Sequence, residues 1–156
     1  MSEVNNEQDE TGAQCDQAYA RLIACTEKRV IECDDANSDT NLLHMCGWDG
    51  IPNPLEWWEN YPARMLNWDV YVEKIDLAQG RKRFPGRVLL GGFDNREGTL
   101  LPAGEKEDIK AFAKRIVREA GKKELIVGAN CTLPMSIDPE RIRWVIEALE
   151  EMESED

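Results

Sequence analysis

The only histidine of the chain lies two residues before a cysteine, in the segment Leu43-His44-Met45-Cys46-Gly47. The apolar run over 41–46 predicts a buried strand, and side chains at positions i and i+2 of a strand point to the same face of the sheet. Imidazole nitrogen and thiolate sulfur are ligands that zinc prefers in proteins. His44 and Cys46 could therefore reach one zinc ion together.

Cys131 could supply a third ligand, because it follows a second predicted strand, over 125–127, at the end where that strand stops. A histidine with two thiolates leaves one coordination position open, as in catalytic zinc sites, where the metal acts as a Lewis acid or holds a substrate thiolate. The spacing alone leaves an alternative open. In that alternative, the histidine ends a strand, and the two cysteines are buried small side chains that bind no metal.

The composition of the chain restricts both its environment and its partners. Its 156 residues are 42% hydrophobic and 32% charged, which is an ordinary globular mixture. The net charge of -12 disfavours nucleic-acid binding, and no apolar run approaches the roughly 18 residues needed to cross a membrane. The acidic N-terminal segment lacks the basic start and apolar middle of a secretion signal, so we expect a cytoplasmic protein with reduced thiols.

Two other groups of side chains are given structural rather than chemical interpretations. Cys15, Cys25 and Cys33 fall on a predicted helix, where thiols are incidental or structural. A small basic cluster is interpreted as a solvated loop; it comprises Arg81, Lys82, Arg83 and Arg87.

The elements that must position the site alternate between helix and strand. Parallel pairing is expected, because strands separated by helices need crossover connections. A doubly wound sheet and part of a (β/α)8 barrel both fit this order, although no G-x-G-x-x-G motif supports dinucleotide binding. The predicted strands are 41–46, 64–68, 87–90 and 125–127, and the predicted helices are 15–34, 55–60, 72–80, 109–120 and a last one that begins at Asp138-Pro139.

Function collects at the carboxyl ends of the strands in both architectures. Four further side chains are predicted to lie there and to line a substrate pocket: Trp48, Asn67, Asp94 and Asn95. Asp94 follows two glycines, which allow a ligand to approach the backbone closely. It is either a pocket acid or a loop aspartate that satisfies its own turn.

The motifs at these strand ends resemble those of the uroporphyrinogen decarboxylase superfamily, which also contains corrinoid-dependent methyltransferases. The similar stretches lie between Tyr19 and Leu149 and occur in the order 43–47, 66–69, 90–95, 98–101, 128–134 and 139–142. The resemblance implies an α/β fold of the TIM-barrel type. Since family chains are about twice as long, we expect four C-terminal βα units of a (β/α)8 barrel over 14–152, between a disordered acidic tail, 1–13, and a frayed acidic tail, 153–156.

The methyltransferase branch of the superfamily has a His-x-Cys motif and a distant cysteine as zinc ligands. The resemblance places these on His44, Cys46 and Cys131. It implies zinc as a cofactor and a corrinoid, carried on a partner, as methyl donor. Zinc in that branch binds a thiol acceptor and favours the thiolate, which takes the methyl group.

Two alternatives to methyl transfer stay open. A uroporphyrinogen decarboxylase-like protein would use Asp94 and no metal, but the chain has no segment like that branch's N-terminal arginine motif and has no histidine after its last strand. A truncated barrel fragment would not be catalytic at all. The chain also has Glu105 where the family usually has a Thr or Ser helix cap.

The partners follow from the half barrel, which leaves two open sheet edges and an apolar inner face. We expect a homodimer, or pairing with a separate N-terminal half-barrel chain. A corrinoid protein is a further possible partner, and activity is expected from the assembled barrel.

Overall fold

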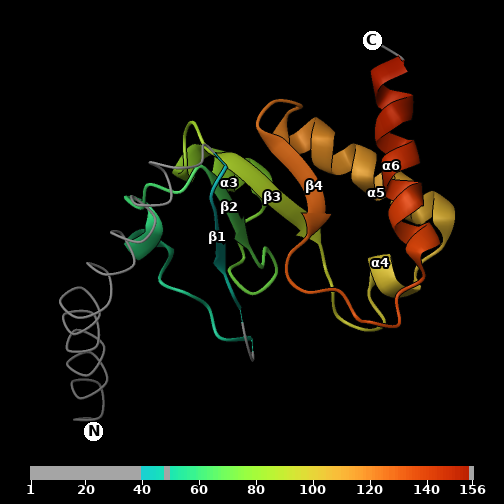
Figure 1. Cartoon of the computed structure of the whole chain (residues 1–156), viewed down its shortest axis with the longest axis horizontal. Helices are drawn as coiled ribbons and strands as arrows, with labels where there is room; N and C mark the ends of the chain where they lie inside the picture. The colour runs from blue at the N-terminus through green and yellow to red at the C-terminus, as the bar shows by residue number, and fades with distance from the viewer. Residues whose placement is uncertain (1–39, 48–49, 155–156) are drawn as a thin grey trace, which may run out of the picture.

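The computed structural model of the chain describes residues 40–47 and 50–154 (Figure 1). The predicted helix over 15–34, its three cysteines, Trp48 and the tail 1–13 lie outside the described residues.

The four strands form one parallel sheet, and their order in space is their order in sequence, β1-β2-β3-β4. A doubly wound sheet would reverse direction at a switch point, whereas a barrel adds each strand beside the last. The fold is therefore α/β and of the partial (β/α)8-barrel type, as predicted. The strands are β1 Leu42–Met45, β2 Met65–Trp68, β3 Val88–Phe93 and β4 Leu125–Ala129.

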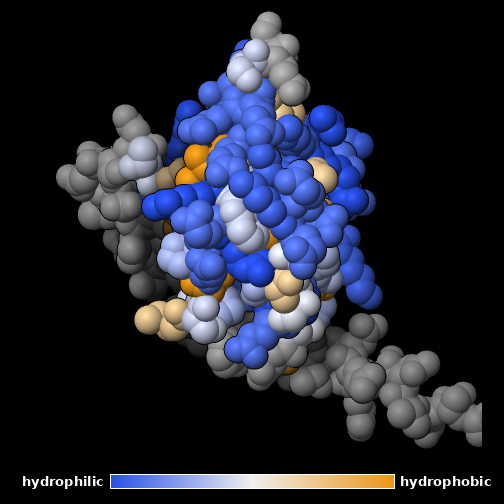
Figure 2. All heavy atoms as spheres, turned by 90° about the vertical axis from the view of Figure 1, so that its right-hand side faces the viewer, coloured by the Kyte–Doolittle hydropathy of each residue, from blue (hydrophilic) through white to orange (hydrophobic). Residues whose placement is uncertain are grey.

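The helices cover one face of this sheet. α3 packs against β3 and α5, α5 contacts β4, and α6 packs along α5 (Figure 1). The outer side of α5 and α6 is mainly hydrophilic, as Figure 2 shows. The elements are η2 Leu55–Trp58, α3 Leu77–Arg83, α4 Leu100–Ala103, α5 Lys106–Ala120 and α6 Pro139–Ser154. Among the described residues, no helix combines the length and the apolar character that a membrane span needs.

The core between sheet and helices is built on a tryptophan. Trp68 of β2 is fully buried, and its ring Nε1 donates a hydrogen bond of 2.8 Å to the Ile75 carbonyl. Its ring also lies against Phe84, with centroids 5.7 Å apart. A Cβ atom on Gly80 of α3 would come within 2.3 Å of the Trp68 ring, so glycine lets this helix approach the sheet.

The prediction for α3 was wrong in both boundaries. The helix begins at Leu77, not at 72, because Asp76 and Gln79 form a capping box in which each side chain accepts a hydrogen bond from the other's backbone N–H. Gly80 lies inside the helix, where the Trp68 contact explains it, rather than at its end.

The ends of the later helices agree better with the sequence. Gly121 follows α5 with a positive φ of 85°, and the Asp138 carboxylate accepts a hydrogen bond of 2.9 Å from the Glu140 N–H at the start of α6. Glu105 precedes α5 without a side-chain cap, as its residue type suggested. α5 nevertheless starts three residues before the predicted boundary, α4 was not predicted, and α6 continues to Ser154.

The basic cluster is not a solvated loop, because two of its arginines bind backbone carbonyls and the third, Arg83, pairs with Glu56 and Glu59. Arg81 lies on α3 and donates to the carbonyls of Ala120 and Lys123, at the carboxyl end of α5. Arg87 donates to the Ala63 carbonyl. These contacts hold α3 to α5 and β3 to the segment before β2.

Ion pairs join α5 to α6. The two helices place three lysines opposite two glutamates, in the pairs Lys106–Glu147, Lys110–Glu147, Lys110–Glu151 and Lys114–Glu151. Hydrogen bonds from Lys110 and then Lys114 lower the pKa of Glu151 to about 2. Because the folded pKa is depressed, these contacts stabilise the fold above the unfolded pKa of about 4.3, and the stabilisation is lost as the pH falls toward 2.

We therefore expect Glu151→Gln to lower Tm measurably at pH 7 and low salt, with Glu150→Gln as the matched control on the neighbouring residue. The difference between the two variants should shrink when salt is added, because the pairs are solvent-exposed, and again as the pH is lowered from about 4.3 toward 2. Thermal denaturation followed by circular dichroism measures both. Equal Tm values for the two variants at neutral pH would contradict this role of Glu151.

Candidate metal centre

The three predicted ligands meet at one rim of the sheet. The ligand atoms of His44, Cys46 and Cys131 all lie within 4.8 Å of one another. The Cys131 Sγ lies 3.4 Å from His44 Nε2 and 3.9 Å from the Cys46 Sγ. His44 and Cys46 are exposed and Cys131 is partly buried, so a solute can reach the group.

This meeting requires a curved sheet. His44 lies on β1 and Cys131 follows β4, and these strands are the two ends of the described sheet. In a flat sheet they would be roughly 14 Å apart, which is three interstrand spacings of about 4.8 Å. The 3.4 Å contact between their side chains therefore shows that the strands curl around a common inner side, as in a barrel.

Two of the three ligand separations fit a tetrahedral zinc site. With Zn–S bonds of about 2.3 Å and Zn–N bonds of about 2.0–2.1 Å, tetrahedral angles place two sulfurs about 3.8 Å apart and a sulfur and a nitrogen about 3.6 Å apart. The observed separations of 3.9 Å and 3.4 Å are close to both values. One nitrogen and two sulfurs also leave a fourth position for a substrate ligand.

Asn67, predicted to line the substrate pocket, lies behind His44. The register pairs the two residues across β1 and β2, and the Asn67 Oδ1 lies 2.5 Å from the His44 Nδ1. Asn67 is only 5% exposed, so its side chain faces the inside of the rim rather than the solvent.

Asp94 is held by its own loop. Its Oδ1 accepts hydrogen bonds from the backbone N–H and the Nε of Arg96, at 3.0 and 2.8 Å, and its Oδ2 lies 2.5 Å from the Arg96 Nη2. Burial alone would raise the pKa of Asp94, but the hydrogen bonds and charge of Arg96 outweigh it and hold the pKa below its usual value. Asp94 is therefore an ionised, paired carboxylate in a turn, which favours the second of the two interpretations made from the sequence.

A cavity of about 400 Å³ opens beside the two thiols. We call it the rim cavity. Asn95 lines it and donates a hydrogen bond of 2.9 Å to the Thr132 carbonyl, which joins the loops after β3 and β4. Its lining residues are Cys46, Gly47, Gly50, Asp69, Val72, Asn95, Arg96, Cys131 and Thr132. No motif in the sequence marked Arg96 as a pocket residue, although a cation two residues after an aspartate is a signal for a turn ion pair.

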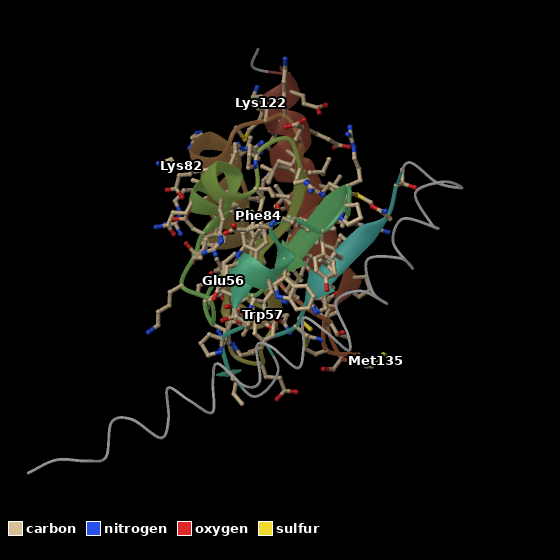
Figure 3. The ribbon with its side chains drawn as sticks, turned by 90° about the vertical axis from the view of Figure 1, so that its left-hand side faces the viewer. Glu56, Trp57, Lys82, Phe84, Lys122 and Met135 are labelled. Atoms are coloured by element: carbon tan, nitrogen blue, oxygen red, sulfur yellow. The ribbon has the colours of Figure 1, made fainter. Side chains whose placement is uncertain are left out.

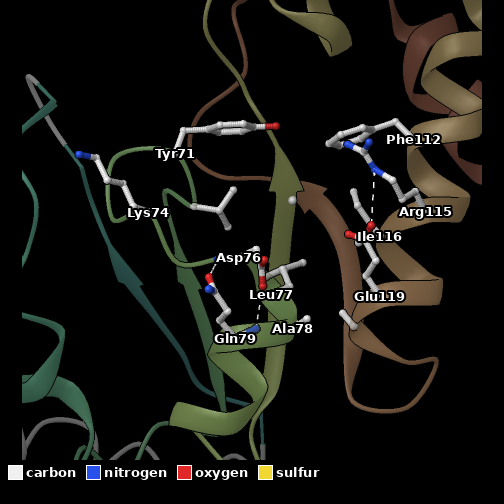
Figure 4. Close-up of a pocket in the computed structure, with 13 residues that line it drawn as sticks. Tyr71, Lys74, Asp76, Leu77, Ala78, Gln79, Phe112, Arg115, Ile116 and Glu119 are labelled. Atoms are coloured by element: carbon white, nitrogen blue, oxygen red, sulfur yellow. Dashed lines mark hydrogen bonds and ion pairs between the residues drawn. The ribbon is translucent and has the colours of Figure 1, made fainter.

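A second cavity, of about 370 Å³, lies between α3 and α5 (Figure 4). Tyr71 and Phe112 border it, and Arg115 extends along it beside Glu119. Burial, followed by the charge of Asp94, raises the pKa of Tyr71. None of the three predicted metal ligands borders this cavity, so it is separate from the rim. Its residues are scattered over 70–120, which is why no sequence motif indicated it.

Comparisons with known proteins agree with this fold. The family model described as uroporphyrinogen decarboxylase (URO-D) matches residues 14–152. A solved structure of a methyltransferase from Methanosarcina mazei superposes with a TM-score of 0.67 at 19% sequence identity, covering 87% of this chain and 37% of that one. At this identity the likeness is one of fold, and the chain spans little more than a third of that methyltransferase. No curated protein matches the chain significantly.

Proposed function

Since the chain belongs to the uroporphyrinogen decarboxylase family, we propose that it provides the metal-binding part of a zinc-dependent methyltransferase that moves a methyl group between a corrinoid and a thiol. The observation that carries the proposal is the convergence of His44, Cys46 and Cys131 at the rim, with spacings suited to tetrahedral zinc. The fold likeness to a methyltransferase is a second support.

The proposed reaction assigns separate roles to the three ligands and to the rim cavity. His44, Cys46 and Cys131 would hold the zinc, which when bound supplies a Lewis acid that favours the thiolate form of an acceptor thiol. The rim cavity begins at the two thiols and has room for a small acceptor. The acceptor sulfur would lose its proton to solvent and form a bond to the methyl carbon, while the carbon–cobalt bond breaks and its electron pair stays on cobalt.

Decarboxylation is less well supported, although the family's name points to it. That hypothesis places Asp94 in the substrate pocket, and Asp94 is paired with Arg96. It also has no use for a histidine and two cysteines at the same rim.

Zinc binding is the first prediction that follows from the proposed function. Protein purified without added metal should contain about one zinc per chain, because two thiolates and an imidazole form a tight site. Cys46→Ser and Cys131→Ser should each lose the metal, while Cys15→Ser serves as the cysteine control and should keep it. Elemental analysis by mass spectrometry gives the stoichiometry. A metal-free wild-type protein, or full zinc retention in both variants, would contradict the proposed ligand set.

Methyl transfer is the second prediction. Zinc-loaded protein, in its native assembly, should convert methylcobalamin and 2-mercaptoethanol to the methyl thioether, and Cys131→Ser should reduce the rate by at least the factor by which it reduces bound zinc. The absorbance of methylcobalamin and mass spectrometry of the thioether follow the reaction. Decarboxylation of a tetrapyrrole with equal rates in wild type and Cys131→Ser would instead support the decarboxylase reading, and inactivity in both assays would support a non-catalytic fragment.

We also propose that a second polypeptide chain completes the barrel. β1 and β4 have no further strand beside them among the described residues, and Leu42 of β1 and Ile126 of β4 are 47% and 42% exposed. Figure 3 looks onto the β1 side of the sheet, with Met135 projecting at the rim. Either a second copy of the chain or a separate chain with the N-terminal half of the barrel could cover these edges and side chains.

Association is the third prediction from this section. Purified chain should form dimers, or should co-purify in equal amounts with a chain that supplies the other strands, because open edges and apolar side chains drive pairing. Light scattering after size exclusion measures the mass. Leu42→Lys should weaken the association, and Ile51→Lys is an exposed apolar control outside the sheet. A wild-type monomer at high concentration would contradict the proposal.

A further inference from the structure

One buried side chain of β2 contacts the three other strands at the metal rim. Asn67 lies on β2, and its Oδ1 is 2.5 Å from the His44 Nδ1 on β1. Its Nδ2 donates to the Leu90 carbonyl of β3 at 2.8 Å and to the Ala129 carbonyl of β4 at 3.3 Å. Asn67 therefore links the strand that carries His44 to the strand that precedes Cys131.

These partners determine which way the Asn67 amide faces. Backbone carbonyl oxygens only accept hydrogen bonds, so the atom that faces Leu90 and Ala129 must be the amide nitrogen. With the amide reversed, its oxygen would face two carbonyl oxygens and both hydrogen bonds would be lost. The Oδ1 atom must then face the ring of His44.

The amide orientation in turn determines the tautomer of His44. An amide oxygen cannot donate, so a hydrogen bond between Asn67 Oδ1 and His44 Nδ1 requires the proton on Nδ1. In the neutral ring the lone pair is then on Nε2. Nε2 is the nitrogen that lies 3.4 Å from the Cys131 Sγ, so it faces the proposed metal position.

Gly91 leaves the space that this arrangement needs. Its φ is +139°, and a Cβ atom there would lie 3.3 Å from the Asn67 Nδ2 and 3.2 Å from the Asn130 Oδ1. Asn130 is fully buried, and its Oδ1 accepts a hydrogen bond of 3.0 Å from the Gly92 N–H. A side chain at Gly91 would press on both amides from the same side.

We propose that Asn67 is a positioning residue that fixes His44 as the Nδ1–H tautomer and aims its Nε2 at the metal. The inference deepens the zinc site proposed above and rests on it for its purpose. The tautomer itself, however, is a property of the metal-free chain and can be measured without zinc.

His44 is the only histidine in the sequence, so nitrogen-15 NMR of histidine-labelled protein reports on this ring alone. We expect the wild-type chain without metal, at about pH 8, where an ordinary imidazole is neutral, to show a protonated Nδ1 and an unprotonated Nε2. Asn67→Ala should remove this preference and give averaged shifts or the other tautomer. A wild-type ring protonated on Nε2, or an unchanged Nδ1–H tautomer in Asn67→Ala, would overturn the proposal.

Two variants separate positioning from general destabilisation. Asn41→Ala is the matched control, because Asn41 is also buried, at 8% exposed, and its Oδ1 accepts the Arg64 N–H just before β2. It should destabilise the fold but leave the His44 tautomer unchanged. Asn67→Asp should keep the Nδ1–H tautomer but lower Tm, because one carboxyl oxygen can still accept from Nδ1–H while the other faces the Leu90 and Ala129 carbonyls.

Metal affinity gives the second readout. Loss of a residue that orients a ligating histidine typically lowers metal affinity by about 10- to 100-fold. We expect a loss in that range for Asn67→Ala, none for Asn41→Ala and recovery in Asn67→Asp, measured by competition with a chromophoric zinc chelator. Equal affinities in Asn67→Ala and Asn41→Ala would overturn the positioning role. Absence of zinc binding in the wild type would refute the metal site instead, while the NMR result would still decide the tautomer.

Discussion

The curvature of the sheet is the constraint on which the site depends, and the Asn67 amide is the interaction that spans it. The proposed ligands come from β1 and from the loop after β4, so they meet only because the strand ends converge. Convergence buries backbone carbonyls at the rim, and a buried polar group without a partner is costly. Asn67 donates to two of these carbonyls and still has an oxygen for His44. The Asn67 side chain therefore provides hydrogen-bond partners for two backbone carbonyls at the rim and also faces the proposed ligand His44.

Glycines allow the helices to pack closely against one face of the sheet and the Asn67 amide to fit against the other. On the helix side, Gly80 leaves space for the Trp68 ring. A Cβ atom on Gly92 would come within 2.7 Å of Ile116 of α5. On the inner side, Gly91 leaves room for the amide of Asn67. Close packing by α3 and α5 supports β2 and β3 from the helix side, and the Asn67 amide lies between carbonyls of β3 and β4. The strands that carry the rim residues are thus supported by contacts on the opposite face of the sheet.

The sequence predicted the parts of this arrangement that depend on local patterns. Apolar runs indicated four strands, and the His44-x-Cys46 spacing placed both side chains on one face. Cys131 was predicted by its position after a strand, and Asn67 was expected at the rim. Its role behind His44 could not be predicted, since its partners Leu90 and Ala129 are 23 and 62 residues away. The pairing of Asp94 with Arg96 is local, and a turn aspartate was one of the two interpretations that the sequence left open. Gly80 was mistaken for a helix end because its reason is the distant Trp68.

The proposed metal site lies entirely within the half of the barrel that this chain forms. The three proposed ligands and Asn67 lie on strands of the described sheet or within two residues of a strand end, and their mutual contacts need no further strand. The side chains that need covering, such as Leu42 and Ile126, belong to the inner face, which other barrel strands would pack against. The proposed metal site and the enclosure of a substrate are therefore separable in this fold. The proposed site depends on contacts at one rim, whereas enclosure would depend on whatever completes the barrel.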